Sequence, residues 1–333
     1  MKTAVIAFTA KGAQLGVKIA QALGGSMYVT DRLAPETGLS PCGGLAQWTG
    51  EQFCQSQALI FVGACGIAVR AIAPYVKDKF TDPAVLSVDE QGRFVVPLLS
   101  GHVGGGNALA QQVAAITGGT AAISTATDVN GVWAVDVWAK SQGLKVGSRP
   151  LAKQVSACLL EGKPVGFCSD VPVEGTLPQG LTDTPGQVNI HVTAKEDREE
   201  NTLALIPTML VLGIGCRRGT PQESIEAAVR HALTGYNRAA VAGVASIDVK
   251  ANEPGLLAWC EGQGLTLTTY DAQTLASLSG DFTPSAFVAQ TVGVDNVCER
   301  SVVAMGATVI RKKYAQNGVT VAVGQLPYTV SFA

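Results

Sequence analysis

The sequence predicts an α/β protein made of two α/β domains with mainly parallel sheets, joined by a small α/β middle region. Runs such as Ala58–Val62 are apolar at every position, which is typical of strands buried on both faces of a parallel sheet. Segments with helical apolar spacing, such as Ala13–Leu23, alternate with these runs. Charged residues make up only 15% of the 333 residues, which is low and fits a chain with much buried surface.

Composition excludes several classes of function. The net charge of −2 provides no basic field for nucleic acid or an anionic membrane. No apolar run reaches the roughly 18 residues of a membrane span, and the longest, Leu203–Ile214, is broken by Pro207. The eight cysteines form no CxxC pair and no zinc-ligand spacing with the three histidines. We therefore expect a reduced, cytoplasmic protein with no metal site, no nucleic acid and no membrane among its partners.

The first domain, residues 1–130, is expected to alternate strands and helices. The expected strands are Thr3–Thr9, Ser26–Thr30, Ala58–Val62, Ala84–Val88, Phe94–Leu98 and Ala121–Ser124. The expected helices are Ala13–Leu23, Leu45–Gln55, Ile67–Ala73 and one that opens near Asn107. Ligands of such sheets bind beyond the carboxyl ends of the strands. Candidate groups follow strand ends at Gly63–Gly66, Ser100–Asn107 and Thr125–Asp128.

The middle region, residues 131–206, combines shorter elements with long loops. We expect helices at Trp133–Gln142 and Leu151–Leu160, and strands at Val165–Cys168, Gln187–Thr193 and Leu203–Ile206. His191 alternates with apolar neighbours, so we interpret it as a hydrogen-bonded strand residue rather than a ligand.

The last domain, residues 207–333, begins at Pro207 with a new α/β pattern. The expected strands are Met209–Ile214, Val241–Ala245 and Leu265–Tyr270, followed by a hairpin of Thr308–Tyr314 and Val319–Val323 around Asn317-Gly318. The expected helices are Ser224–Leu233, Pro254–Glu261 and Asp295–Met305. Thr220, Pro221 and Glu223 predict a capping box before the first of these helices.

A glycine-rich loop, Ser100-Gly101-His102-Val103-Gly104-Gly105-Gly106-Asn107, lies between a strand and a helix. Bare backbone N–H groups beside a helix N-terminus attract anions, and Asn107 is suited to cap that helix. His102 can act as a base and then as an acid near neutral pH. The alternative is a tight turn with a surface histidine, because the glycines match neither the Walker nor the dinucleotide pattern. Asp128 either joins this site or caps the next helix.

Two further segments carry candidate chemistry. Arg217 and Arg218 stand in a glycine loop after a strand, where guanidinium groups can bind carboxylate or phosphate. The alternative is that one arginine pairs with a local acid while the other is solvated. Cys298 lies near a helix start, which can lower a thiol pKa, but packing is the simpler interpretation.

Several motifs in this order resemble the cobalt-precorrin-5A hydrolase family (CbiG) of anaerobic cobalamin biosynthesis. They are Gly66-Ile67-Ala68-Val69-Arg70, Lys77-Asp78-Lys79, the loop Ser100–Asn107, Thr125-Ala126-Thr127-Asp128, Gly213–Gly219 and Val297-Cys298-Glu299. The resemblance extends over essentially the whole chain. It implies an enzyme of corrin metabolism that opens the δ-lactone of cobalt-precorrin-5A and releases a methylated meso carbon as acetaldehyde, which gives cobalt-precorrin-5B. It also implies a C-terminal domain similar to a stand-alone protein of the aerobic pathway.

The resemblance and the chemistry together suggest roles for particular residues. The catalytic candidates are His102, Asp128 and Asn107. The substrate-binding candidates are Arg70, Lys79, Ser100, Gly104, Gly105, Gly106, Arg217, Arg218 and Glu299. A macrocycle with many acetate and propionate arms requires dispersed cationic groups, and lactone opening requires an activated water and an oxyanion donor. The cobalt belongs to the substrate, so no cofactor of the protein is expected.

Two other functions remain open from the sequence. One is a corrinoid-binding carrier without catalysis, which would hold an unstable intermediate for neighbouring enzymes of the corrin pathway. The other is an enzyme that binds a phosphate ligand at its two glycine loops. For the hydrolase, the expected partners are the cobalt-precorrin-5A tetrapyrrole and, transiently, other corrin-pathway enzymes.

Overall fold

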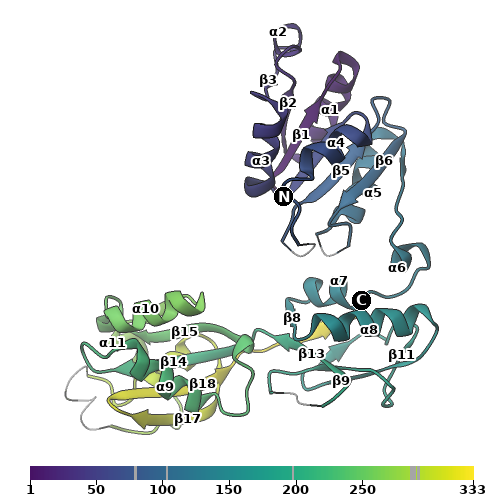
Figure 1. The fold of residues 1–333 in the computed structure, drawn as a ribbon. Helices are drawn as coiled ribbons and strands as arrows, with labels where there is room; N and C mark the ends of the chain where they lie inside the picture. The colour runs from purple at the N-terminus through teal and green to yellow at the C-terminus, as the bar shows by residue number, and fades with distance from the viewer. Residues whose placement is uncertain (79–80, 103, 197–198, 286–289, 291–292) are drawn as a thin grey trace. The chain divides into compact units, whose positions relative to one another are not determined.

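The computed structural model describes residues 1–78, 81–102, 104–196, 199–285, 290 and 293–333. The chain forms two compact units, Met1–Val137 and Trp138–Ala333, and each is described by itself (Figure 1). Both contain β-sheets with helices, so the expected α/β class is confirmed. Within the described residues, no helix is both long and apolar enough to cross a membrane.

The first unit is organised around a seven-stranded sheet of order β3-β2-β1-β4-β5-β6-β7. Its strands are β1 (Thr3–Ala7), β2 (Ser26–Val29), β3 (Ser40–Pro41), β4 (Ala58–Val62), β5 (Ala84–Val88), β6 (Phe94–Leu99) and β7 (Thr120–Ala121). Neighbours pair in parallel except β5 and β6, which are antiparallel. β7 is shorter than the expected strand Ala121–Ser124.

Helices cover both faces of this sheet. Helices α1 (Ala10–Leu23) and α5 (Gly106–Thr117) cover one face, and α3 (Leu45–Gln55) and α4 (Cys65–Ile72) cover the other. The remaining helices of this stretch are α2 (Ala34–Thr37), α6 (Ala126–Val129) and α7 (Val135–Ser141), the last of which continues into the second unit. Val5 and Ala7 of β1 share a core with α1 and α5, whereas Ala4 and Ile6 share one with α3 and α4. Burial on both faces explains why these strands are apolar at consecutive positions.

The second unit contains two five-stranded sheets. The first has order β11-β9-β12-β13-β8, with β8 antiparallel to β13 and the other pairs parallel. Its strands are β8 (Leu144–Val146), β9 (Val165–Ser169), β11 (Leu181–Thr182), β12 (Asn189–Val192) and β13 (Thr202–Pro207). Helix α8 (Arg149–Leu160) packs against β9 and β13.

The other sheet has order β16-β15-β14-β18-β17. Its strands are β14 (Leu210–Cys216), β15 (Val241–Ile247), β16 (Leu267–Tyr270), β17 (Thr308–Gln316) and β18 (Val319–Gln325). The helices around it are α9 (Gln222–Ala232), α10 (Pro254–Gln263), α11 (Ala272–Ser277) and α13 (Cys298–Ala304), with short 3₁₀ turns η1 (Arg238–Ala240) and η2 (Asp248–Lys250). The expected hairpin is confirmed: Asn317 and Gly318 have φ of 48° and 78° between the antiparallel β17 and β18.

After β18 the chain returns to the part of the second unit that contains the sheet β11-β9-β12-β13-β8, where it adds a separate pair of strands. Strand β19 (Val330–Ser331) pairs in parallel with β10 (Val173–Glu174). The Phe332 ring stacks on Trp138 with centroids 4.6 Å apart, and Trp138 Nε1 donates to the Ser331 carbonyl at 2.7 Å. The second unit therefore includes residues 138–206 of the expected middle region together with the expected last domain, whereas residues 131–137 belong to the first unit.

Candidate active site

The loop between β6 and α5 is tightly folded on itself. Ser100 has a φ of 53°, and Gly105 has a φ of 81° at the N-cap of α5. Ser100 is buried, and its hydroxyl donates to the Asp82 carbonyl at 2.9 Å. The structure therefore places Ser100 as a support of the loop, where its hydroxyl is already engaged. Val103 lies outside the described residues.

Packing inside the loop explains two of its glycines. A Cβ on Gly104 would lie 2.3 Å from Ser100 Cβ, and a Cβ on Gly101 would lie 2.5 Å from Asn107 Oδ1. Both distances are too short for any side chain. The packing of the loop itself therefore requires glycine at these two positions. The sequence alone did not show this role, because the glycines match no known phosphate-binding pattern.

The loop amides differ from the expectation of outward-facing anion donors. The Gly105 N–H donates to the His102 carbonyl, and the Gly106 N–H donates to the Ser100 carbonyl, at 3.1 and 3.0 Å. The expectation of bare N–H groups that attract an anion is wrong for Gly105 and Gly106, because both already donate within the loop. Gly104 contributes through its lack of a side chain.

Asn107 lies inside α5, so the prediction that it caps this helix is wrong. Gly105 holds the cap position, and the Asn107 side chain is buried and turned toward α6. Its Nδ2 donates to Asp128 Oδ2 and to Thr125 Oγ1, each at 2.9 Å. The amide thereby fixes Asp128 relative to the glycine loop.

His102 and Asp128 are in direct contact. His102 Nδ1 lies 3.1 Å from Asp128 Oδ2, the same oxygen that accepts from Asn107. Asp128 belongs to α6, so it does not cap the following helix. The structure thus brings together His102, Asp128 and Asn107, the three residues that the sequence singled out for catalysis.

Two residues face the other ring nitrogen: Thr127, from the motif Thr125–Asp128, and Asp136, which the sequence did not indicate. His102 Nε2 lies 3.4 Å from Asp136 Oδ1 and 3.5 Å from Thr127 Oγ1. Both distances are longer than the 3.1 Å between His102 Nδ1 and Asp128 Oδ2, so these two groups hold Nε2 less closely than Asp128 holds Nδ1. The His102 side chain retains 19% exposure, which leaves it accessible. No sequence motif surrounds Asp136. Its position near His102 follows from the start of α7, which places Asp136 in the first turn of that helix.

This arrangement can perform general acid–base chemistry. A carboxylate that accepts from Nδ1–H fixes the tautomer whose lone pair lies on Nε2, and it stabilises the imidazolium that forms when Nε2 takes a proton. Asn107 in turn restrains the carboxylate. The groups are therefore ordered as base, orienting carboxylate and supporting amide.

The predicted cationic groups lie elsewhere. Arg70 is exposed in the last turn of α4, and Lys79 lies outside the described residues. Arg217 and Arg218 are exposed in the second unit, directly after β14. In the same loop the Thr220 hydroxyl donates to the Arg217 carbonyl at 2.7 Å, and α9 begins only at Gln222. The predicted capping box is therefore wrong, because the Thr220 hydroxyl is used in the turn before the helix.

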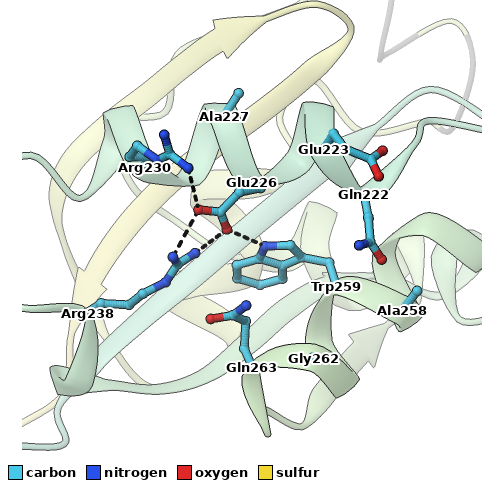
Figure 2. Close-up of a pocket in the computed structure, with 10 residues that line it drawn as sticks. All are labelled: Gln222, Glu223, Glu226, Ala227, Arg230, Arg238, Ala258, Trp259, Gly262 and Gln263. Carbon is cyan, nitrogen blue, oxygen red and sulfur yellow. Dashed lines mark hydrogen bonds and ion pairs between the residues drawn. The ribbon is translucent and has the colours of Figure 1, made fainter.

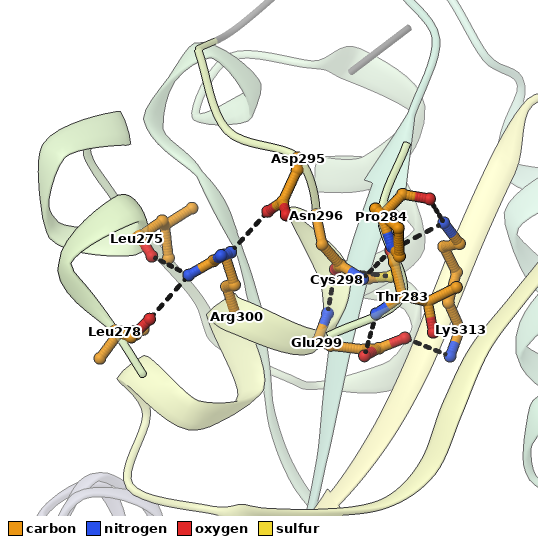
Figure 3. A network of polar contacts seen from close by, with 10 residues as sticks. All are labelled: Leu275, Leu278, Thr283, Pro284, Asp295, Asn296, Cys298, Glu299, Arg300 and Lys313. Carbon is orange, nitrogen blue, oxygen red and sulfur yellow. Dashed lines mark hydrogen bonds and ion pairs between the residues drawn. The ribbon is translucent and has the colours of Figure 1, made fainter. Parts of the chain in front are cut away.

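Glu299 is an interior residue with no exposure to solvent (Figure 3). Its carboxylate accepts from the Lys313 and Thr283 backbone N–H groups at 2.8 and 3.0 Å. Burial alone would raise the pKa of Glu299, but these hydrogen bonds outweigh it and lower the pKa. The geometry gives Glu299 a structural role, in contrast to its predicted contact with substrate.

Neighbouring Cys298 is also buried, and burial raises the pKa of its thiol to about 12. The packing interpretation of Cys298 is therefore favoured over an activated thiol. His191, as expected, faces a hydrogen-bonding partner, with Nε2 3.3 Å from Asp170 Oδ1.

A hollow of about 580 Å³ between α9 and α10 contains none of the predicted site residues (Figure 2). Its most connected group is Glu226, which accepts from Arg238, Arg230 and Trp259 Nε1. Elsewhere in the described ranges, no group of three or more His, Cys, Asp or Glu side chains could hold a metal ion.

Comparisons with known proteins match this chain along its length. The family description "Cobalamin synthesis G N-terminal" matches residues 47–128, "Cobalamin biosynthesis central region" matches 133–207, and "Cobalamin synthesis G C-terminus" matches 210–324. The cobalt-precorrin-5A hydrolase of Salmonella typhimurium is 34% identical over 313 residues, which cover 88% of this chain and 89% of that protein. The chain belongs to the cobalt-precorrin-5A hydrolase family.

A second relative agrees with this assignment, which confirms the resemblance seen in the motifs. The cobalt-precorrin-5A hydrolase of Priestia megaterium is 31% identical over 297 residues, covering 82% of this chain and 79% of that protein. Protein CobE of a Sinorhizobium species is 39% identical over 93 residues, covering 27% of this chain and 60% of that protein. His102, Asn107 and Asp128 fall within the N-terminal match of the hydrolase family, whereas Asp136 falls within the central one.

Proposed function

We propose that this protein is a cobalt-precorrin-5A hydrolase of cobalamin biosynthesis. It opens the δ-lactone of cobalt-precorrin-5A and releases acetaldehyde, which leaves cobalt-precorrin-5B. Membership of the family and the names of two relatives above 30% identity support this proposal. The cobalt travels with the tetrapyrrole substrate, and the protein contributes no cofactor. We expect the reaction in the cytoplasm, with transient contacts to other enzymes of the corrin pathway and none to nucleic acid or membrane.

The observation that carries the mechanism is the contact of His102 Nδ1 with the Asp128 carboxylate, which Asn107 restrains. With its Nδ1–H directed at Asp128, His102 takes a proton from water through Nε2. The resulting hydroxide adds to the lactone carbonyl, and the ring C–O bond breaks. The imidazolium then returns the proton to the departing alkoxide, so that a carboxylic acid and a hydroxyl replace the lactone.

The second step uses the regenerated neutral imidazole. His102 takes the proton of the new hydroxyl, the C=O bond of acetaldehyde forms, and the C–C bond to the macrocycle breaks. The electron pair of that bond passes to the macrocycle, which is then protonated. One base of this kind can therefore serve both steps, because each begins with proton removal from an O–H group.

The exposed arginines supply binding rather than chemistry in this proposal. Arg217 and Arg218 can donate to the acetate and propionate arms of the macrocycle, and Arg70 is a further exposed cation. The N–H groups of an exposed guanidinium are accessible to a ligand. Such groups suit a substrate whose carboxylates are distributed around its rim.

The test is to incubate the purified protein with cobalt-precorrin-5A and to measure acetaldehyde release. A catalyst releases acetaldehyde over many turnovers, whereas a carrier binds the macrocycle and leaves the lactone intact. A thermal shift induced by nucleotides, with no acetaldehyde released, would instead support the enzyme that binds a phosphate ligand.

His102→Ala should lower turnover by roughly 10²- to 10⁴-fold, because it removes the base from both steps. The matched control is His191→Ala, which removes a histidine that pairs with Asp170 in the second unit and should retain turnover within about twofold. If His102→Ala released acetaldehyde as fast as the control, His102 would have no part in the mechanism.

A further inference from the structure

We propose that Glu253 is a positioning residue for substrate binding, because it holds the loop that presents Arg217 and Arg218. The inference rests on the proposed function, since it assigns these arginines to the carboxylate arms of the substrate. Glu253 is 34 positions away from the loop residue that it contacts, and it stands at the N-cap of α10.

The Glu253 carboxylate binds the loop directly. One oxygen, Oε1, accepts from the Gly219 backbone N–H at 2.6 Å, and the other, Oε2, accepts from Lys250 Nζ at 2.9 Å. Only 5% of Glu253 is exposed, and the Lys250 side chain is 14% exposed. Both oxygens are therefore engaged, and the loop is joined through Glu253 to the turn η2.

The charge on Glu253 is maintained by these contacts. Burial alone would raise the pKa of Glu253, but the hydrogen bonds from Lys250 and Gly219, together with the nearby charge of Arg218, lower it. A buried ion pair contributes little net stability, because desolvation offsets the attraction. The pairing with Lys250 has a more specific consequence. Because Lys250 and Gly219 already occupy both carboxylate oxygens, Glu253 does not need Arg217 or Arg218 as an ion-pair partner.

The backbone of the same loop is fixed from other directions. The Arg217 N–H donates to the Gly318 carbonyl at 3.0 Å, which joins the loop to the turn between β17 and β18. A Cβ on Gly255 would lie 2.0 Å from the Thr220 carbonyl oxygen, so the first turn of α10 packs directly against the loop. These contacts hold the backbone at both ends, and Glu253 holds Gly219 between them.

A fixed loop lowers the cost of binding through its arginines. Long side chains on a mobile loop lose backbone and rotamer freedom when they bind a ligand, whereas a preformed loop has already lost the backbone part. Loss of Glu253 should therefore weaken substrate binding and leave the proton transfers at His102 unchanged. In steady-state kinetics, such uniform binding affects KM rather than kcat.

The experiment measures acetaldehyde release from cobalt-precorrin-5A by wild type, Glu253→Gln and Glu253→Asp. Glutamine removes the charge, and aspartate retains the charge but is one carbon too short to reach Gly219. Both variants should raise KM about tenfold and change kcat by less than about twofold. The control is Glu261→Gln, an exposed carboxylate on α10, which should match wild type.

A double-mutant cycle separates positioning from a general structural role. In a background of Arg217→Gln and Arg218→Gln, the Glu253→Gln change should have no further effect on KM, because the groups that it positions are already absent. An unchanged KM in Glu253→Gln, a fall confined to kcat, or an equal rise in KM with and without the arginines would each overturn the inference.

A second measurement does not depend on activity. Hydrogen exchange at the Gly219 amide should become faster in Glu253→Asp than in wild type and Glu261→Gln, because the shorter side chain no longer reaches that N–H. Unchanged exchange would also overturn the inference. If wild type released no acetaldehyde while exchange changed as expected, the proposed function would fail and the structural part of the inference would remain.

Discussion

Glu226 shows how a single half-buried carboxylate organises the surface between α9 and α10. Both of its oxygens accept from Arg238, and Trp259 Nε1 donates to Oε2 at 2.9 Å (Figure 2). The hydrogen bonds from Arg238 are the largest influence, and with that of Trp259 they outweigh burial and lower the pKa of Glu226 to about 2. The carboxylate is therefore stabilised as an anion in the folded state.

This pKa has a direct consequence for stability against pH. A carboxyl whose pKa is lower in the folded state stabilises the protein above its unfolded pKa, and that contribution is lost as pH falls through the folded value. Glu226→Gln should therefore lower the free energy of unfolding by about 2 kcal/mol at pH 7. The difference from wild type should shrink between about pH 4.5 and pH 2.

Denaturant unfolding of both proteins across this pH range checks the prediction. Glu223→Gln, which alters an exposed carboxylate in the first turn of the same helix, is the control and should follow wild type at every pH. A difference between Glu226→Gln and wild type that stayed constant down to pH 2 would contradict the assigned ionisation.

Single residues also show where sequence reasoning reached its limit. His102, Asp128 and Asn107 were identifiable because polar residues after strand ends converge at one edge of a parallel sheet. Asp136, Glu253 and the interior position of Glu299 were not, because each depends on contacts between segments far apart in the chain. A carboxylate can bind a ligand only if it is accessible. The sequence around a single acidic residue does not show whether that residue is buried.

At the scale of an element, the β6–α5 loop depends on the absence of a side chain at Gly104. A Cβ there would lie 2.6 Å from the Ser100 carbonyl oxygen, so Gly104→Ala must displace the loop that carries His102. Small displacements of a catalytic group can reduce rates about 100-fold. We expect Gly104→Ala to lower kcat by roughly 10- to 100-fold, with the rest of the unit folded.

The control for this prediction is Gly262→Ala in α10, where a Cβ would meet no atom within 4 Å. Alanine is favoured over glycine inside a helix by about 0.5–1 kcal/mol, so this variant should be slightly more stable and fully active. Acetaldehyde assays and circular dichroism on both variants provide the comparison. Equal activity would show that the loop tolerates the displacement.

The longer elements followed the sequence closely, and the shorter ones did not. Strands β4 and β5 begin and end where the apolar pattern predicts, because burial on both faces of the sheet makes that pattern continuous. Helix α3 also has the predicted bounds, with Trp48, Thr49 and Phe53 buried and much of the rest exposed. Strands β10 and β19 contain two residues each, too few for any periodicity, and their pairing joins distant parts of the chain. The capping box at Thr220 failed because a nearby carbonyl competed for its hydroxyl.

At the scale of the whole molecule, the second unit depends on the return of residues 328–333 to the middle region. The Tyr328 hydroxyl donates to the Gln142 carbonyl, the Ser331 N–H donates to Gln142 Oε1 at 2.8 Å, and Phe332 stacks on Trp138. The middle region expected at residues 131–206 therefore obtains part of its packing from the end of the sequence beyond β18. A fragment cut near Pro207 would lose that packing.

Phe332→Ala should lower the free energy of unfolding of the second unit by about 2–3 kcal/mol, because it removes the ring that covers Trp138. Tryptophan emission should also shift to the red as Trp138, now 7% exposed, meets water. Phe94→Ala, the same change at a side chain that is 57% exposed, should cost less than about 0.5 kcal/mol. Matching results from the two variants would show that the ring stack does not stabilise the unit.

The hydrogen bond from Trp138 to Ser331 joins residues 193 positions apart. Closing so long a loop reduces the conformational entropy of the chain before the contact can stabilise the fold. During synthesis the strands of the first unit can pair as soon as about 120 residues have emerged, since its strand β7 ends at Ala121. The middle region, although made next, must wait for β19, so we expect it to complete its packing last and to be the part of the chain exposed longest to chaperones and proteases.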